Sequence, residues 1–325
     1  MAHVRVLVWL SFCLMASACM PKSVSTFLRN PPDYLPSQVQ LHGIPFVAQT
    51  GEFCGPASLA MILGFYGQEA DLEQLGLEVF VPALGGSLQP EMSAYLRRRG
   101  LIAYKLSGGL ESLFAQIANG HPVIVLQNLG LANVPFWHYS VVIGYDLERA
   151  KIILHSGQRE NYSLSLKKFS YTCARGQNWA LTPLPAGSFP SRPNRQQAFI
   201  DSVAFINTPG QSNYAKTHYS AALKLCPNDE AFSIALSNVF YSQDKYDQAI
   251  KVLLKATSTP TKSPLIFNNL AYNLAAKHCY ASAQESVKCA VALDPSPEFL
   301  KSQIEIENLD SVGKTPKDCP IIRCD

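Results

Sequence analysis

The stretch "VAQTGEFCGPASLAMILGFYG", from Val47 to Gly67, joins a lone cysteine to an apolar run. Cys54 is followed at once by Gly55 and Pro56, and proline is favoured in the first turn of a helix. The residues after it are apolar on nearly every face, which predicts a buried helix over residues 55–66. Cys54 is therefore expected at a helix N-terminus, where unpaired N–H groups and the helix dipole favour a thiolate.

A thiolate nucleophile needs a base and an oxyanion donor from elsewhere in the chain. His138 follows the Pro-containing loop "GLANVPFWH" and begins the alternating run "HYSVVIGYD". A residue at the start of a strand, next to a loop, can face a helix N-terminus across a cleft. Gln49, five residues before Cys54, supplies an amide side chain just upstream of the cysteine. These residues form a candidate catalytic set.

Residues 41–185 mix helical patterns with β-type runs. "PVIVLQN" is typical of a buried strand, and the run from His138 onward predicts a hairpin that turns over residues 146–150. Helices come first and an antiparallel sheet follows, which predicts an α+β domain. The stretch "PLPAGSFPSRPNR" then predicts a linker.

The segments "QTGEFCGPASLAMIL" and "HYSVVIGYD" resemble two motifs of the bacteriocin-processing, double-glycine leader cysteine peptidases. Those motifs are Gln…Cys-Gly-Pro-Ala and His-Tyr-x-Val-Val-x-Gly, and these enzymes are papain-like and α+β. The resemblance covers about residues 43–160. It implies that Cys54 is the nucleophile, His138 the general base and acid, and Gln49 the oxyanion donor. No phosphate-binding loop or metal motif accompanies it, and no cofactor is expected.

The third member of the site departs from the family pattern. Where the family places an aspartate that orients the imidazole, "KIILHSG" has His155, 17 residues after His138. A neutral histidine can hold another imidazole, as in the Cys-His-His order of the NlpC-type cell-wall peptidases, but it supplies no negative charge. We expect His155 to orient His138. A solvent-facing His155, with Ser156 or Gln158 in its place, is the alternative.

Residues 196–300 are helical in pattern and contain a 34-residue repeat. Ala215, Ala249 and Ala283 are 34 residues apart, and each has another alanine seven residues later. Small residues at helix crossings with this period resemble the tetratricopeptide repeat. Two good copies are expected at 230–263 and 264–297, with a degenerate copy at about 196–229 and a tail at 301–325. A generic helical bundle is the alternative. Repeat arrays of this kind bind proteins, so a protein partner is expected here.

The N-terminus predicts export. An apolar run, "VLVWLSFCLMA", ends in "ASAC", which resembles a bacterial lipoprotein box. Residues 1–18 are thus expected to be a signal peptide, Cys19 the lipidated residue, and residues 19–40 an extended, Pro-containing linker. The expected location is the cell envelope, anchored to a membrane and facing the periplasm. Plain secretion and a retained anchor are the alternatives.

The other cysteines outside the signal predict no metal site. Cys319 and Cys324 lie five residues apart in the tail and are candidates for a disulfide in an oxidising compartment. The remaining ones are expected to be buried thiols: Cys173, Cys226, Cys279 and Cys289.

The chain carries 27 Lys and Arg against 24 Asp and Glu, a net charge of +3, with no basic stripe interleaved with aromatics. This balance argues against a nucleic-acid partner. The leading hypothesis is a membrane-tethered periplasmic cysteine peptidase that cleaves a peptide or protein, its repeats recruiting substrate or partner. The alternatives are a catalytically weak or inactive adaptor, and an amide hydrolase that acts on peptidoglycan. A layout of this kind also resembles uncharacterised bacterial lipoproteins that join such a peptidase domain to tetratricopeptide repeats.

Overall fold

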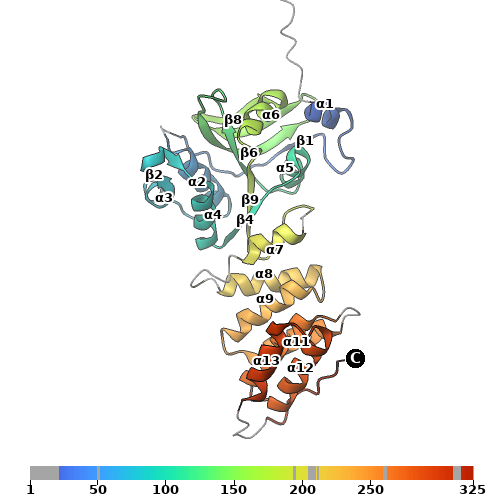
Figure 1. Ribbon diagram of the computed structural model, residues 1–325. Helices are drawn as coiled ribbons and strands as arrows, with labels where there is room; N and C mark the ends of the chain where they lie inside the picture. Colours follow the sequence, from blue (N-terminus) through green and yellow to red (C-terminus); the bar gives the residue numbers. More distant parts are fainter. Residues whose placement is uncertain are drawn as a thin grey trace, which may run out of the picture. The chain divides into compact units, whose positions relative to one another are not determined.

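The computed structural model describes residues 22–49, 52–192, 195–203, 210, 212–258, 262–309 and 316–324. The chain divides into two compact units (Figure 1). The first contains residues up to 95 together with 104–183, and the second contains residues 96–103 together with those from 184 onward. The expected signal peptide and the lipidation residue Cys19 lie outside the described residues.

Helices and strands alternate irregularly between residues 22 and 185. In chain order they are α1 (Lys22–Arg29), β1 (Gln38–Gln40), α2 (Cys54–Phe65), α3 (Leu72–Val79), β2 (Phe80–Val81), a 3-10 turn (Pro82–Leu84), β3 (Gly86–Ser87), α4 (Gln89–Arg98), β4 (Leu101–Lys105), α5 (Gly109–Ala118), β5 (Val123–Asn128), β6 (Trp137–Asp146), β7 (Lys151–Ser156), β8 (Arg159–Ser165), α6 (Leu166–Arg175) and β9 (Ala180–Pro185).

The main sheet has seven strands, in the order β4-β9-β5-β6-β7-β8, with β1 paired to β6 as well. The pairings of β6 with β5, β7 and β1 are all antiparallel. β6 and β7 form the predicted hairpin, which turns at Ala150 in a left-handed conformation (φ 50°). The α+β class expected from the sequence is thus confirmed for this unit.

One face of the sheet is covered by α1, α5 and α6 (Figure 1). Val125, Val142 and Leu154 point from neighbouring strands into this core, where Phe114 and Phe169 meet them from α5 and α6. The side chains alternate along each strand, so Ser140 and Val142 share this face while Tyr139 and Val141 point to the other. α2 packs against β6 and is buried from Gly55 to Leu63.

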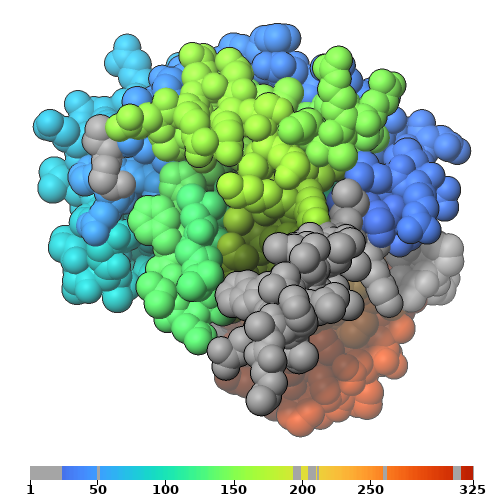
Figure 2. Space-filling model, turned by 90° about the horizontal axis from the view of Figure 1, so that it is seen from above, coloured from blue at the N-terminus to red at the C-terminus, as the bar shows by residue number. Residues whose placement is uncertain are grey.

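Residues 22–40 are part of the domain, so the prediction of an extended linker at 19–40 is wrong over the residues that the structure describes. α1 buries Val24 completely, and the Phe27 ring lies 5.5 Å from that of Phe114. Leu35 is also buried in this core, and β1 joins the sheet. α1 contacts α6, and blue N-terminal residues adjoin the yellow-green residues of that region at the surface (Figure 2). Apolar side chains within the Pro-containing stretch make this packing possible.

The second unit is helical over its described residues. Its helices are α7 (Arg195–Val203), α8 (Ser212–Leu225), α9 (Glu230–Tyr241), α10 (Tyr246–Thr257), α11 (Pro264–Ala276), α12 (Tyr280–Leu293) and α13 (Pro297–Glu307).

The 34-residue period reappears in the backbone of these helices. α9 and α11 begin 34 residues apart, and so do α10 and α12. Gly210, Asp244 and His278 are spaced by the same interval, and all three adopt positive φ (78°, 56° and 63°). The repeated alanines are buried: Ala215, Ala222, Ala249, Ala256, Ala283 and Ala290. This regularity agrees with two helical hairpins of equal length, and their identity as tetratricopeptide repeats stays a prediction.

The tail does not pair its own cysteines, as the sequence spacing suggested. Cys279 bonds to Cys319 and Cys289 to Cys324, so each bridge ties the tail to α12 or to the residue before it. The prediction of buried free thiols at 279 and 289 is therefore wrong. Each bond joins residues 35 or 40 positions apart, a distance that the local spacing of the tail cysteines could not reveal.

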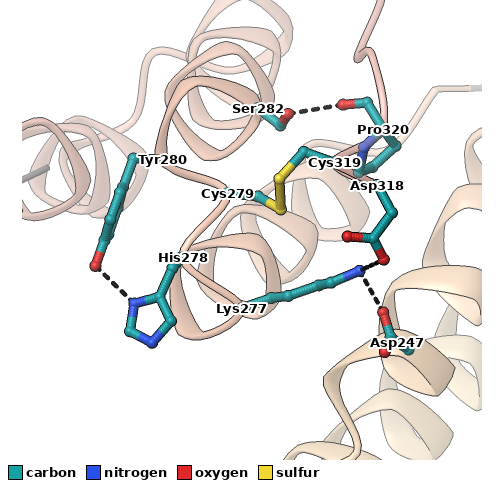
Figure 3. The surroundings of a disulfide bond; sticks show 9 residues. All are labelled: Asp247, Lys277, His278, Cys279, Tyr280, Ser282, Asp318, Cys319 and Pro320. Carbon is teal, nitrogen blue, oxygen red and sulfur yellow. Dashed lines mark hydrogen bonds and ion pairs between the residues drawn. A yellow bond between two sulfur atoms is a disulfide. The ribbon is translucent and has the colours of Figure 1, made fainter. Parts of the chain in front are cut away.

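Further contacts hold the tail beside the first disulfide (Figure 3). Lys277 pairs with both Asp318 of the tail and Asp247 of α10. The Ser282 hydroxyl donates a hydrogen bond of 2.7 Å to the carbonyl of Pro320. The C-terminal segment is thus a strap across the helical unit.

Cys319→Ser with Cys324→Ser is expected to lower the free energy of unfolding of the helical unit. Closing loops of this length contributes about 4 kcal/mol each in the chain-entropy model, so the loss is several kcal/mol. Urea unfolding followed by circular dichroism checks this. Fluorescence of Trp137 and Trp179, both in the first unit, serves as the internal reference and is expected to stay unchanged. Cys226→Ser is the control, and an equal midpoint for all three proteins contradicts the prediction.

No helix among the described residues is long and apolar enough to cross a membrane.

Candidate active site

Cys54 is the first residue of α2 and is half-buried. A Cβ at Gly55 would lie 2.6 Å from the Cβ of Ser87, so the segment containing β3 can approach the start of α2 only because this residue is glycine. The predicted helix is confirmed, and Cys54 is at its N-terminus as expected.

Burial raises the pKa of the Cys54 thiol and is the largest effect on it. Backbone N–H groups of Tyr139, Gly55 and Cys54 itself act in the opposite direction. Burial outweighs these groups, so the expectation that the helix N-terminus gives a low pKa is wrong for the free protein. The group of β6 that reaches the sulfur is the amide of Tyr139, the residue directly after His138.

His138 is the second residue of β6, and its Nε2 lies 3.0 Å from the Oγ of Ser156. Ser156 ends β7 and is only 6% exposed. Burial, followed by the positive charge of Arg159, lowers the pKa of His138 to about 4. The resting site at neutral pH is therefore a thiol beside a neutral imidazole. Catalytic hydrogen bonds in sites without substrate often tighten only on binding.

Ser156 begins a chain of buried hydrogen bonds. Ser140 Oγ lies 3.0 Å from Ser156 Oγ and 3.1 Å from Gln127 Oε1. Gln127 Nε2 donates to Thr172 Oγ1 at 2.7 Å, and the Thr172 hydroxyl donates to the Phe169 carbonyl at 2.8 Å. Each hydroxyl has one proton and Gln127 Oε1 only accepts. The arrangement that satisfies every member runs from imidazole N–H through Ser156, Ser140, Gln127 and Thr172 to that carbonyl. It orients the ring but contributes no negative charge.

The structure does not place His155 on His138. His155 is 1% exposed, and its Nδ1 accepts a hydrogen bond of 3.2 Å from the Asn161 N–H. Its proton is thus on Nε2, 3.4 Å from the Ile44 carbonyl. Successive residues of a strand point to opposite faces, so His155 and Ser156 cannot both face the His138 ring. The orienting role predicted for His155 falls instead to Ser156.

Gln49 is 6% exposed and is clamped by Gly157. The Gln49 N–H donates to the Gly157 carbonyl at 3.0 Å, and the Gly157 N–H donates to Gln49 Oε1 at 3.1 Å. These bonds fix the orientation of the amide, because Oε1 must accept and Nε2 then takes the other position. Nε2 is buried and has no hydrogen-bond partner among the described residues. A buried N–H donor left unpaired is costly, and it is what an oxyanion hole requires.

The loop from residue 129 to 137, just before His138, exposes several large apolar side chains: Leu129, Leu131, Val134, Phe136 and Trp137. Asn128 holds the loop in shape, since its Oδ1 accepts from the N–H groups of Gly130 and Phe136, both at 2.9 Å. An ordered loop thus presents apolar surface beside the candidate base. Trp137 is 51% exposed, so it does not form part of the buried core.

Residues 35–175 match the model of the Peptidase_C39 like family. This stretch is a papain-like domain of the C39 peptidase type. Two solved structures resemble it at 19% identity: a C39-like peptidase from Bacillus anthracis and the peptidase domain of Streptococcus ComA, a bi-functional ABC transporter involved in quorum sensing. They have TM-scores of 0.39 and 0.35, cover 46% and 44% of this chain, and are themselves covered to 98%. No curated protein matches the chain.

Sequence reasoning selected Cys54, His138 and Gln49, and the structure arranges groups from all three around the start of α2 and the end of β7. It missed Gly157, whose backbone carries no side-chain signal. Within the described residues there is no group of three or more His, Cys, Asp or Glu that could hold a metal ion.

The reaction of Cys54 with iodoacetamide is expected to accelerate steadily with pH. The raised thiol pKa puts the growth of the thiolate population at or above the ordinary range, about pH 8.5. Mass spectrometry of the alkylated peptide measures the rate, with Cys226 as the internal reference. A plateau that begins in acid, as a preformed thiolate–imidazolium pair would give, contradicts the prediction.

Ser156→Asp is expected to raise the pKa of His138 from about 4 toward or beyond the ordinary histidine value. A carboxylate next to the imidazole favours the charged ring. An NMR titration of the His138 ring resonances, assigned with His138→Ala, measures this shift.

His155→Gln is the matched control, because His155 bonds to Ile44 and Asn161 instead. It is expected to leave the His138 pKa in place. If His155→Gln moves that pKa as far as Ser156→Asp does, the assignment of Ser156 is wrong.

Proposed function

We propose that the chain is a papain-like cysteine peptidase that cleaves a peptide or protein substrate. The observation that carries this proposal is the pair of adjacent residues at the end of β7. Ser156 holds His138, and Gly157 holds Gln49 with its Nε2 still unpaired. A base and an oxyanion donor are thus held together in the domain whose helix α2 begins at Cys54.

The residues perform the steps of amide hydrolysis as follows. The Cys54 sulfur attacks the scissile carbonyl while its proton passes to His138. Gln49 Nε2 and the Cys54 N–H stabilise the oxyanion. His138 then gives the proton to the leaving amine, and water hydrolyses the thioester with His138 as the base. Ser156 keeps the ring oriented through these steps.

A non-catalytic adaptor is the second candidate. It is favoured by the raised pKa of Cys54 and by the neutral Ser156 where a carboxylate would stabilise the imidazolium. The third candidate, hydrolysis of a peptidoglycan amide, was suggested by the Cys-His-His order. It has lost that support because His155 bonds elsewhere.

The proposal includes export and a membrane anchor through Cys19, with the protein facing the periplasm. Two disulfides in the helical unit support an oxidising compartment. We further propose that the helical repeats bind the protein substrate or a partner, since arrays of helical hairpins offer extended binding surfaces.

Cleavage of fluorescently labelled, unfolded casein tests the activity. Cys54→Ala is expected to abolish cleavage, and Gln49→Ala to lower kcat about 10²–10³-fold because one oxyanion donor is lost. Cys226→Ser, which removes a thiol outside the site, is the control and is expected to keep full activity. Cleavage by the unmodified chain that is no faster than by Cys54→Ala, with a matching null effect of His138→Ala, rules out the peptidase and leaves the adaptor.

A further inference from the structure

A pocket of about 460 Å³ lies between β7, β8 and α6, on the sheet face that carries Ser156. All of its lining residues belong to the first unit. Figure 2 shows the yellow-green residues of this part of the chain at the surface of the molecule. The volume is in the range that small-molecule sites occupy.

The charged lining residues are all basic: Arg159, Lys167, Lys168 and Arg175. No carboxylate is among the residues that line the pocket. α6 also begins here, capped by Ser165, whose side chain accepts from the Lys168 N–H, so the positive end of its dipole adds to the field. A pocket with this charge attracts anions.

A shift in strand pairing brings Arg159 to this face. The register between β7 and β8 changes after Leu154, which pairs with Tyr162, so that Ser156 pairs with Arg159. Asn161 adopts positive φ (47°) within the shift. The Arg159 guanidinium then lies 3.6 Å from the centre of the Tyr162 ring. The irregularity thus aims a cation and an aromatic ring into one pocket.

Apolar side chains line the pocket as well: Leu129, Leu154, Tyr162, Leu164 and Tyr171. The exposed or half-buried basic groups and the apolar surface together suit a ligand with an anionic head and an apolar body. Thr172 and Gln127, two members of the hydrogen-bond chain that ends on His138, are also in the lining.

We propose that this pocket binds an organic anion with an aromatic or other apolar body, and that the bound anion promotes ionisation of the Cys54–His138 pair. The coupling half of this inference rests on the proposed peptidase function. The site lacks the carboxylate that would stabilise an imidazolium, and Arg159 destabilises it. An anion paired with Arg159 cancels that repulsion and places negative charge next to Ser156.

Binding is tested on the full chain with phenyl phosphate, compared with inorganic phosphate and with phenol at constant ionic strength. Calorimetry is expected to show saturable binding of phenyl phosphate, weaker binding of phosphate and none of phenol. The double variant Arg159→Gln with Lys168→Gln is expected to weaken phenyl phosphate at least tenfold. Arg149→Gln, which removes an exposed positive charge at the β6–β7 turn, is the matched control and is expected to bind normally.

Coupling is tested by the rate of Cys54 alkylation. Saturating phenyl phosphate is expected to raise this rate about tenfold, for about one pKa unit of stabilisation, with the same concentration dependence as binding. The double variant is expected not to respond.

Three results overturn the binding site: no saturable binding, equal weakening by Arg149→Gln, or phenol bound as tightly as phenyl phosphate. Equal affinity for inorganic phosphate overturns the assignment to an organic anion. Binding without a change in alkylation rate overturns the coupling. If binding and rate enhancement occur as expected but casein is not cleaved, this inference stands and the peptidase proposal fails.

Discussion

The site depends on hydrogen bonds made by two successive residues, Ser156 and Gly157. The Ser156 hydroxyl bonds to the His138 ring, and the Gly157 backbone bonds twice to Gln49. One short turn therefore sets the position of both the base and the oxyanion donor. Because β7 is flanked by β6 and β8, the sheet holds this turn rigidly. Any change that shifts the end of β7 must disturb both groups together.

The electrostatics of the site follow from the same turn. A serine hydroxyl orients an imidazole as well as a carboxylate does, but it does not stabilise the charged ring. Burial and Arg159 then keep His138 neutral, and burial keeps Cys54 protonated. The resting site is thus an uncharged pair whose ionisation is sensitive to charge introduced nearby. This sensitivity gives the basic pocket on the same face of the sheet its significance.

Local patterns predicted much of the fold and the site. The apolar run after Cys54 and the alternation after His138 gave the correct helix and hairpin, because these depend on side-chain periodicity. The 34-residue spacing of alanines anticipated helices that begin at the same interval. Prediction failed where contacts are remote in sequence, as for the disulfides of Cys279 and Cys289. It failed also at residues 22–40, where prolines concealed apolar side chains that pack on α5 and α6.

The sequence by itself determined the reactive residues: a cysteine at a helix N-terminus, an upstream glutamine, and a histidine at the start of a strand. Only the tertiary structure decided which residue holds that histidine. His155 and Ser156 are neighbours, and a strand sends neighbouring side chains to opposite faces. Which face meets His138 depends on how β7 aligns with β6 and β8, including the register shifts beside it. Such alignment arises from packing of the whole sheet, so no local pattern could reveal it.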